Sequence, residues 1–309
     1  MITSMTVVQH LDERPILSRV ALGTAQMGLP YGATNRHPLP DHAEVEAMLD
    51  LATASGIGWI DTAPAYGDAE LRLGKHLGRH PSLRVATKVR ALTDVPVGQV
   101  VRAVRESVSR SVDRLGRERI DLLLLHHVGD LSRPDTDEIV EALAALKAEG
   151  VAIRLGVSVY DPEDLDAVMT RQLFDVVQTP LNPLDRRFAT DGVLQALDRC
   201  SIVLHARSLF LQGLLITPAA DLPDFARHHP AIEAWRAWLG GSTSPIAGCL
   251  GLVLAEPRIE CAIVGVATAA QLQDVVKAAT SSNELPVFSP PPADPFLLDP
   301  RRWPPRTST

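Results

Sequence analysis

The stretch DTAPAYGDAELRLG, residues 61–74, decides the fold. It begins with an acid, Asp61, at the end of a short apolar run, and it carries a phenol, Tyr66, in the segment that follows. Two later apolar runs end in a similar way, one at the amine of Lys88 and the next at the imidazole of His126. In a barrel of parallel strands, side chains at the strand ends meet at one rim. The order of these pieces therefore predicts that the four side chains share a rim.

Eight apolar runs of strand length alternate with segments of helical periodicity. Most of the runs are apolar almost throughout, as are strands that are buried on both faces. Alternation of strands and helices favours right-handed βαβ units and a parallel sheet. We therefore expect an α/β fold, a (β/α)8 TIM barrel. The expected strands cover residues 19–24, 59–63, 84–89, 121–127, 154–159, 176–181, 202–207 and 261–266.

The length of 309 residues suits one such barrel of roughly 250 residues with two extensions. We predict a single barrel domain over residues 1–309, with an N-terminal hairpin over 1–18, the barrel over 19–280 and a tail over 281–309. The tail holds eight of the 24 prolines, which disfavours regular helix and favours extended structure. It either drapes over the surface or crosses the barrel mouth, where Phe288, Phe296 or Trp303 would touch substrate.

One expected helix has an apolar stripe that ends at Gly116, a typical helix stop. The stripe consists of Val101, Val104, Val108, Val112 and Leu115.

Composition and charge exclude several classes of function. The net charge is -7 with mixed signs, so no basic face for nucleic acid is expected, and no apolar run is long enough to span a membrane. The N-terminus does not read as a secretion signal. The three cysteines are far apart and lack zinc-site spacing, so we expect no metal and reduced thiols in a cytoplasmic protein. That leaves a small molecule as the expected partner, and the acid, phenol, amine and imidazole gathered at one rim suit a carbonyl substrate.

Taken together, these motifs resemble those of aldo-keto reductases from residue 22 to the eighth strand. The family pattern DTAxxYGxxExxxG is matched in full by residues 61–74, and its lysine strand by TK at 87–88. The pattern DxxxxH over residues 121–126 selects His126 over His127. The resemblance implies a nicotinamide cofactor, usually NADPH, bound without a Rossmann fold. The chain has no GxGxxG after a strand, which agrees with that implication.

These residue types can protonate a carbonyl oxygen while hydride reaches its carbon. A free phenol has a pKa near 10, and a neighbouring ammonium lowers it. On the family pattern, Asp61 would hold Lys88 charged and oriented. Tyr66 would donate the proton, and His126 would hydrogen-bond the same oxygen. We therefore predict an NAD(P)H-dependent oxidoreductase that reduces an aldehyde or ketone to an alcohol.

The cofactor half of the pattern departs from the family at several positions. Val159 replaces a common asparagine, Arg207 replaces the tyrosine that commonly stacks on nicotinamide, and Gln271 stands where arginine is common. No lysine or arginine occurs in residues 265–275, so NADH becomes credible beside NADPH. The expected cofactor contacts are Gly23, Thr24, Asp61, Ser158, Gln178, Arg207, Ser208, Gly213, Gly265 and Gln271.

The opening segment LGTAQMGLPYGATNR, residues 22–36, resembles a branch that includes proteins of bacterial sugar and cell-surface biosynthesis. In that case Tyr31, Asn35 and Arg36 would border the substrate. Their hydrogen-bonding groups suit a hydroxylated substrate, such as a sugar-derived aldehyde.

Three alternatives remain open at this point. Oxidation of an aldose at C1 would use the same residues in reverse. A cofactor-binding barrel with little turnover is permitted by Val159 and Arg207. The complete set of the other four side chains argues against it; this tetrad consists of Asp61, Tyr66, Lys88 and His126. A metal-dependent hydrolase could use His126, His205 and Asp61 as ligands, but the first strand lacks an HxH pair.

Overall fold

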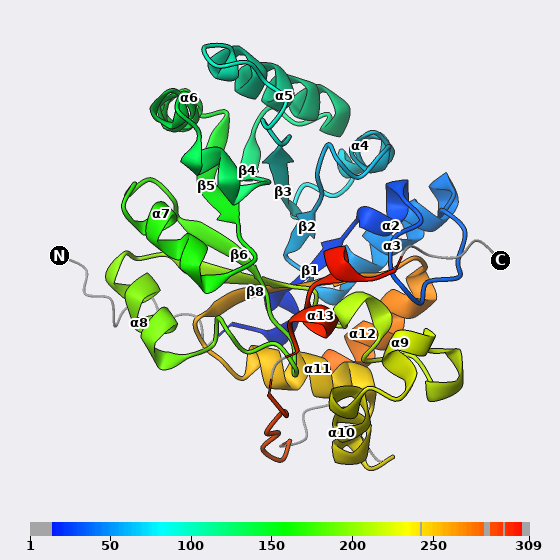
Figure 1. Cartoon of the computed structure of the whole chain (residues 1–309). Helices are drawn as coiled ribbons and strands as arrows, with labels where there is room; N and C mark the ends of the chain where they lie inside the picture. Colours follow the sequence, from blue (N-terminus) through cyan, green and yellow to red (C-terminus); the bar gives the residue numbers. More distant parts are fainter. Residues whose placement is uncertain (1–13, 242, 281–284, 293, 305–309) are drawn as a thin grey trace.

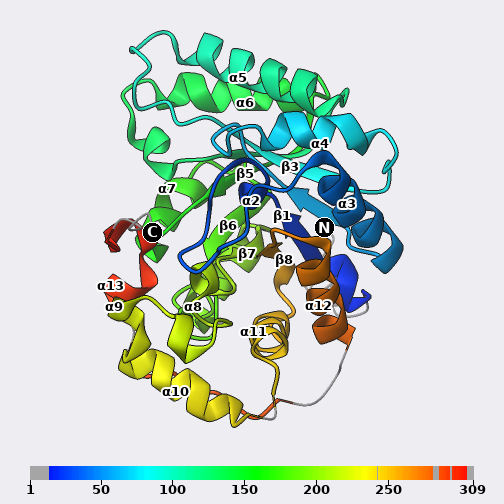
Figure 2. The same cartoon turned by 90° about the vertical axis from the view of Figure 1, so that its right-hand side faces the viewer.

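Eight parallel strands close into a barrel in sequence order, which confirms the predicted TIM barrel (Figures 1 and 2). This computed structural model describes residues 14–241, 243–280, 285–292 and 294–304. The strands are β1 (Val20–Gly23), β2 (Trp59–Asp61), β3 (Arg84–Val89), β4 (Ile120–Leu125), β5 (Ala152–Ser158), β6 (Val176–Pro180), β7 (Val203–Arg207) and β8 (Ile259–Gly265).

Helices cover the outside of the barrel, because each strand is followed by an amphipathic segment that returns the chain to the start of the next strand (Figure 2). No helix in the described residues is both long and apolar enough to cross a bilayer. The helices that follow the strands are α3 (His42–Ser55), α4 (Ala69–Leu77), α5 (Val100–Leu115), α6 (Thr136–Ala148), α7 (Leu165–Met169), α8 (Asp191–Arg199), α11 (Pro245–Leu254) and α12 (Ala269–Thr280). Shorter or inserted helices are α2 (Ala25–Gly28), α9 (Asp224–Arg227), α10 (Pro230–Leu239) and α13 (Pro295–Leu298).

A small apolar cluster fills the barrel interior and sets which side chains reach the rim. Residues two apart on a strand point to the same side, so each interior position leads to a rim position two residues later. Interior residues of the cluster and the rim residues that follow them are Trp59 and Asp61, Ala86 and Lys88, Leu124 and His126, and Val176 and Gln178.

A charged cluster lies near the N-terminal ends of the strands, opposite the rim. Glu260 Oε2 is 3.0 Å from His205 Nε2, and Arg154 Nη1 donates to both carboxylate oxygens at 2.8 and 3.0 Å. The ring of Trp59 meets His205 edge-on, and Arg84 lies 4.2 Å over the indole. Because these contacts pair a nearly buried carboxylate, the cluster should stabilise the base of the barrel.

Removing Glu260 is expected to change the acid stability of the fold. Burial would raise the pKa of Glu260, but the hydrogen bond from His205 and the charge of Arg154 lower it to about 2. The stabilisation is therefore present above the ordinary carboxyl pKa of 4.5 and is lost as pH falls toward 2. A shift of this size corresponds to about 3 kcal/mol. We expect urea unfolding to show Glu260→Gln less stable at neutral pH, with the gap closing between those pH values. Parallel stability curves would contradict this account.

The structure bears on two sequence expectations outside the strands. Residues 1–13 of the predicted hairpin lie outside the described residues, and Ile16–Arg19 forms a 3-10 helix rather than a hairpin strand. In α5 the buried stripe runs through Val100, whereas Val101 is 38% exposed. An α-helix has 3.6 residues per turn, so Val100 lies on the same face as Val104, whereas Val101 lies next to that face. Gly116 ends α5 with a φ of 60°, as expected.

The tail contains two short helices instead of only extended chain, α13 and a 3-10 helix at Pro300–Arg302. Each begins with proline, which lacks an N–H that the first turn would leave unpaired. Asp294 and Asp299 cap them by accepting the N–H of Phe296 and Arg301. The tail aromatics pack on the β7–β8 connection, since Phe288 contacts Trp235 and Trp238, and Phe296 and Trp303 contact Phe225.

Candidate active site

A buried ion pair forms the base of the site. Lys88 Nζ donates to Asp61 Oδ1 at 2.8 Å, to Asp61 Oδ2 at 3.0 Å and to the carbonyl of Thr62 at 2.9 Å. Gln178 Nε2 donates to Asp61 Oδ2 at 2.7 Å. Burial alone would lower the pKa of Lys88, but the adjacent Asp61 carboxylate overcomes burial and raises it. Lys88 is therefore an ammonium whose position is fixed by three acceptors.

Tyr66 lies in the loop after β2, with the Lys88 nitrogen 5.0 Å from the centre of its ring. The sequence predicted that the ammonium would lower the phenol pKa. In the structure burial has the larger effect and raises the pKa of Tyr66, while the charges of Lys88 and Arg207 oppose it. Tyr66 therefore keeps its proton at neutral pH, as a general acid must before it reacts.

His126 follows the last residue of β4, and its ring meets the Tyr66 ring edge-on at 6.0 Å. His126 is half-buried and His127 is exposed, which fits the alternation that continues from Leu124. Burial, followed by the charge of Lys88, lowers the pKa of His126 to about 4. The imidazole is therefore neutral at neutral pH and can donate one hydrogen bond to a substrate oxygen.

Two glycines let the Tyr66 loop pack closely against α2. A Cβ on Gly28 would lie only 1.9 Å from the carbonyl oxygen of Tyr66, and one on Gly67 would lie 2.4 Å from the carbonyl oxygen of Gly28. Gly67 also has a φ of 56°, which side chains rarely adopt. The glycines of this region therefore set the position of the phenol.

Gly28→Ala is expected to move the Tyr66 loop away from Lys88. The overlap with backbone should cost about 1–3 kcal/mol of stability. A displacement of the Tyr66 phenol by about 1 Å should reduce turnover by roughly 100-fold. Gly78→Ala is the matched control, since a Cβ there meets nothing within 4 Å and the backbone is helical. Steady-state kinetics and thermal unfolding of both variants would test this, and equal turnover in the two would refute it.

Several of the predicted cofactor residues lie on barrel strands beside the tetrad. Gly23 pairs with Gly265 across β1 and β8, and Ser158, the last residue of β5, pairs with Gln178 in the middle of β6. Thr24 is fully buried, and its hydroxyl donates to the carbonyl of Asp61 at 3.0 Å. Its side chain therefore helps to hold β2 in place.

The loop after β7 has an unusual backbone. Ser208, Leu211, Gln212 and Gly213 have φ values of 60°, 45°, 52° and 96°. Non-glycine residues with positive φ are strained, and such strain tends to collect at ligand sites. Thr217 of this segment donates to Thr34 Oγ1 at 2.8 Å, which ties the loop after β7 to the loop after β1.

The rim between β1 and β8 fits a ligand with polar groups. The side-chain oxygen of Gln26 is buried and has no hydrogen-bond partner among the described residues. A Cβ on Gly265 would lie 2.6 Å from the side-chain nitrogen of Gln26, so the Gln26 amide packs directly against this glycine. A buried oxygen that lacks a partner at this rim agrees with a bound group that donates a hydrogen bond, as the carboxamide of a nicotinamide does.

The N-terminus of α12 is already occupied by side-chain oxygens. Gln271 Oε1 accepts from Ala267 N at 2.8 Å, and Thr268 Oγ1 accepts from Gln271 N at 3.2 Å. Glu44 of α3, which is distant in the sequence, accepts from Ala269 N at 2.5 Å. Sequence reasoning missed Glu44, because 225 residues separate it from Ala269.

The residues expected to border the substrate have different roles. Although 39% of Tyr31 is exposed, the burial of its phenol among neighbouring atoms raises its pKa to about 12, and the nearby phenols of Tyr66 and Tyr160 add to this effect. Asn35 shapes its own loop, since Nδ2 donates to the Tyr31 carbonyl and Oδ1 accepts from His37 N. Arg36 is exposed. Of the three, Tyr31 is the residue whose pKa is raised by Tyr66, a member of the tetrad.

The metal-site alternative does not have its ligands together. His205 contacts Glu260 near the barrel base, and Asp61 is bonded to Lys88 at the rim. Among the described residues, no group of three or more His, Cys, Asp or Glu side chains could hold a metal ion.

The family model described as the Aldo/keto reductase family matches residues 19–285. The chain belongs to the aldo/keto reductase family. Its members are NAD(P)-dependent oxidoreductases, so this chain is an oxidoreductase of that kind. The resemblance inferred from residues 61–74, 87–88 and 121–126 is thereby confirmed.

Several relatives are enzymes whose names refer to sugars. The chain is 33% identical to the D-threo-aldose 1-dehydrogenase of a Pseudomonas species, covering 63% of this chain and 69% of that protein. It is 27% identical to the 6-dehydroglucose reductase of Agrobacterium fabrum, covering 69% and 70%. It is 28% identical to the NADH-specific methylglyoxal reductase of Escherichia coli, covering 64% and 65%. A holo aldo-keto reductase structure from Bacillus halodurans shares the fold, with a TM-score of 0.70, 23% identity and coverage of 85% and 87%.

Proposed function

We propose that this aldo/keto reductase reduces the carbonyl group of a sugar-derived aldehyde or ketone, with Tyr66 as the general acid. The observation that carries the proposal is the buried Asp61–Lys88 ion pair beneath a protonated Tyr66 and a neutral His126. The names of the Pseudomonas and Agrobacterium relatives support a sugar-derived substrate.

In this proposal each side chain has one role. The nicotinamide, when bound, supplies hydride. Tyr66 Oη donates its proton to the carbonyl oxygen, and His126 donates a hydrogen bond to the same oxygen and orients it. The positive charge of Lys88 stabilises the phenolate that Tyr66 leaves behind. Asp61, fixed in turn by Gln178, holds Lys88 in place.

The raised pKa of Tyr66 favours the reductive direction over aldose oxidation, which would need the phenolate as a base. We expect the rate of the chemical step in reduction to be level from roughly pH 5 to 9. His126, with a pKa of about 4, is neutral above the lower limit, and Tyr66 keeps its proton below the upper one. Single-turnover rates across this range would test it. A rate that falls between pH 7 and 8 would show that the phenol pKa is lowered instead.

We also propose that NADH is preferred over NADPH. Residues 265–275 contain no cation, and the Glu44 carboxylate lies at the N-terminus of α12 after β8. Helix N-termini after the last barrel strands are common phosphate sites, and a carboxylate there would repel a 2′-phosphate. A carboxylate can instead accept from the ribose 2′-hydroxyl. The proposed cofactor contacts remain Gly23, Thr24, Asp61, Ser158, Gln178, Arg207, Ser208, Gly213, Gly265 and Gln271.

Fluorescence titration with NADH and NADPH tests both parts. We expect NADH to bind at least about tenfold more tightly than NADPH. Glu44→Gln should narrow this difference. Glu46→Gln is the matched control on α3, because Glu46 pairs with Arg79 instead. Tighter binding of NADPH by the wild type would contradict the preference, and binding of neither cofactor would contradict the proposed function.

A further inference from the structure

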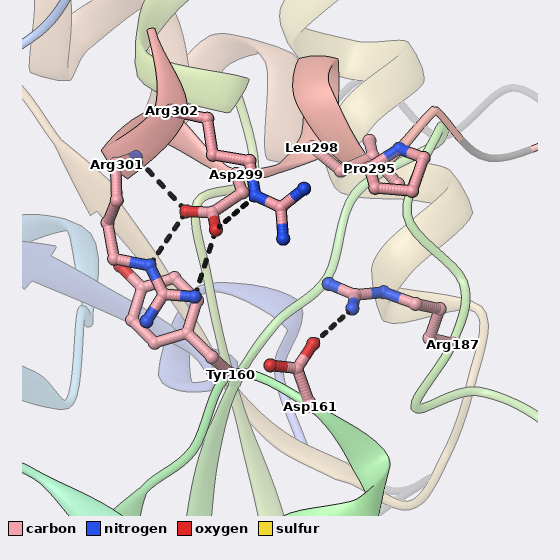
Figure 3. Close-up of a pocket in the computed structure, with 8 residues that line it drawn as sticks. All are labelled: Tyr160, Asp161, Arg187, Pro295, Leu298, Asp299, Arg301 and Arg302. Carbon is pink, nitrogen blue, oxygen red and sulfur yellow. Dashed lines mark hydrogen bonds and ion pairs between the residues drawn. The ribbon is translucent and has the colours of Figure 1, made fainter.

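Two guanidinium groups stack on one tyrosine at the rim. The Cζ atom of Arg207 lies 4.0 Å from the ring centre of Tyr160, and that of Arg301 lies 3.9 Å from it. Two cations cannot share one face of a ring at this distance, so the Tyr160 ring separates them. Figure 3 shows the Arg301 side of this stack, where the tail lies against the segment that follows β5.

The two arginines differ in how their charge is compensated. Arg301 donates to both carboxylate oxygens of Asp299, at 2.8 and 2.9 Å. Arg207 donates to the Val159 carbonyl at 3.0 Å and to Ser208 Oγ at 3.4 Å, which are both neutral acceptors. Within the described residues, no carboxylate lies within ion-pair distance of Arg207. A guanidinium has five N–H donors, so Arg207 retains donors for a ligand.

Arg207 also lies close to the reacting groups. It is the last residue of β7. Its positive charge contributes a lowering effect to the pKa values of Tyr66, Tyr31 and His126. The other cation beside Tyr66 is Lys88, whose charge Asp61 neutralises. Arg207 therefore contributes positive charge without a carboxylate partner where a substrate carbonyl would be reduced.

We propose that Arg207 recognises an acidic group, a carboxylate or a phosphate, on the substrate. This inference rests on the proposed function and narrows its substrate class to acidic sugars and related carbonyl compounds. The N–H groups of a guanidinium lie in its plane and match two oxygens of such a group, while its faces remain free to stack on rings. Contact with the nicotinamide ring is compatible with this role.

Arg301 is a positioning residue in this arrangement. It holds the Tyr160 ring from one side, and Arg207 rests on the ring from the other. The pair Asp299–Arg301 thereby links the C-terminal tail to the substrate site. Loss of Arg301 should reduce selectivity for acidic substrates less than loss of Arg207 does, and it should do so through KM more than through kcat.

The kinetic test compares D-glucuronate, D-glucose 6-phosphate and D-glucose, with NADH as reductant. Both acidic sugars carry the charge at C6, and comparing them separates carboxylate from phosphate recognition. We expect wild-type kcat/KM to be about 10- to 100-fold higher for at least one acidic sugar than for glucose. Arg207→Gln should reduce that ratio to near one, and Arg207→Lys should keep an intermediate ratio because it keeps charge without the planar fork.

Arg186→Gln provides the matched control, because it removes a partly exposed guanidinium from the segment after β6. Its ratio should equal that of the wild type. A wild-type ratio near one, or an unchanged ratio in Arg207→Gln and Arg207→Lys, would overturn the proposal. A tenfold weaker NADH affinity in Arg207→Gln with an unchanged ratio would also overturn it, since it would assign the anion to the cofactor.

A binding measurement separates failure of this inference from failure of the proposed function. Calorimetry with D-gluconate, which has no carbonyl to reduce, and with inorganic phosphate needs no turnover. We expect the wild type to bind at least one of them, and Arg207→Gln to bind it about 10- to 100-fold more weakly. Equal binding by both proteins would refute the role of Arg207 even if sugars are reduced. Loss of binding would support it even if none of the three sugars is reduced.

Discussion

Tyr66→Phe is expected to lower the rate of carbonyl reduction by about 10²- to 10⁴-fold, the usual contribution of a positioned general acid. The substitution removes the proton donor and keeps the ring that meets His126 edge-on. Lys88 donates to Asp61 and to the carbonyl of Thr62, so the ammonium stays in position when the phenol oxygen is removed. Affinity for NADH should therefore stay within about threefold of the wild-type value, because the lost interaction is made in the transition state.

Single-turnover kinetics with saturating cofactor would measure the rate, and fluorescence titration would measure the affinity. Normal turnover by Tyr66→Phe on a good substrate would show that another group donates the proton. A parallel loss of cofactor binding would show that Tyr66 acts mainly in the cofactor site.

Lys88→Met is expected to damage both stability and activity. The substitution leaves the Asp61 carboxylate buried without its ammonium partner, and such a change typically costs about 3–5 kcal/mol. Tyr66 also loses the cation that would stabilise its phenolate, so the reduction rate should fall by about 10²-fold or more. Chemical unfolding and single-turnover kinetics would measure the two effects separately.

The double variant Asp61→Asn with Lys88→Met separates these two roles. Without the carboxylate no charge is left unpaired, so we expect it to recover most of the lost stability while turnover stays low. Recovery of turnover would mean that the Lys88 charge is unnecessary for proton transfer. Equal instability in the single and double variants would mean that the ion pair is not what the buried site depends on.

The barrel and its tetrad could be predicted because their signals are local. The motifs at 61–74, 87–88 and 121–126 name the four side chains, and in the structure the interior residues Ala86 and Leu124 lead to Lys88 and His126 two residues later. The same rule explains why His126, rather than His127, faces Tyr66.

Other features depend on contacts between distant parts of the chain. Glu44 reaches the N-terminus of α12, and Arg301 reaches Tyr160 from the tail, so neither contact leaves a signal in a short window of sequence. The tail prolines predicted extended chain, yet proline at a first helical position, after a capping aspartate, started two short helices.

The pKa of Tyr66 shows why a correct contact can still give a wrong direction. The sequence placed Lys88 beside the phenol, and that placement agrees with the structure. How far the loop is buried depends on packing around Gly28 and Gly67, which the motif does not reveal. Burial raises the phenol pKa by more than Lys88 lowers it, so the resting enzyme is set up to donate a proton.

The most direct test of the central claim is isotope transfer from the cofactor. The enzyme would be given NADH in which both hydrogens at C4 of the dihydronicotinamide are deuterium, together with a sugar-derived aldehyde such as D-glyceraldehyde, and the alcohol product would be analysed by mass spectrometry. Our account predicts one deuterium at the former carbonyl carbon with the wild type, and a much lower yield with Tyr66→Phe. Alcohol formed without deuterium would contradict it. So would a failure of the enzyme to oxidise either NADH or NADPH with any aldehyde.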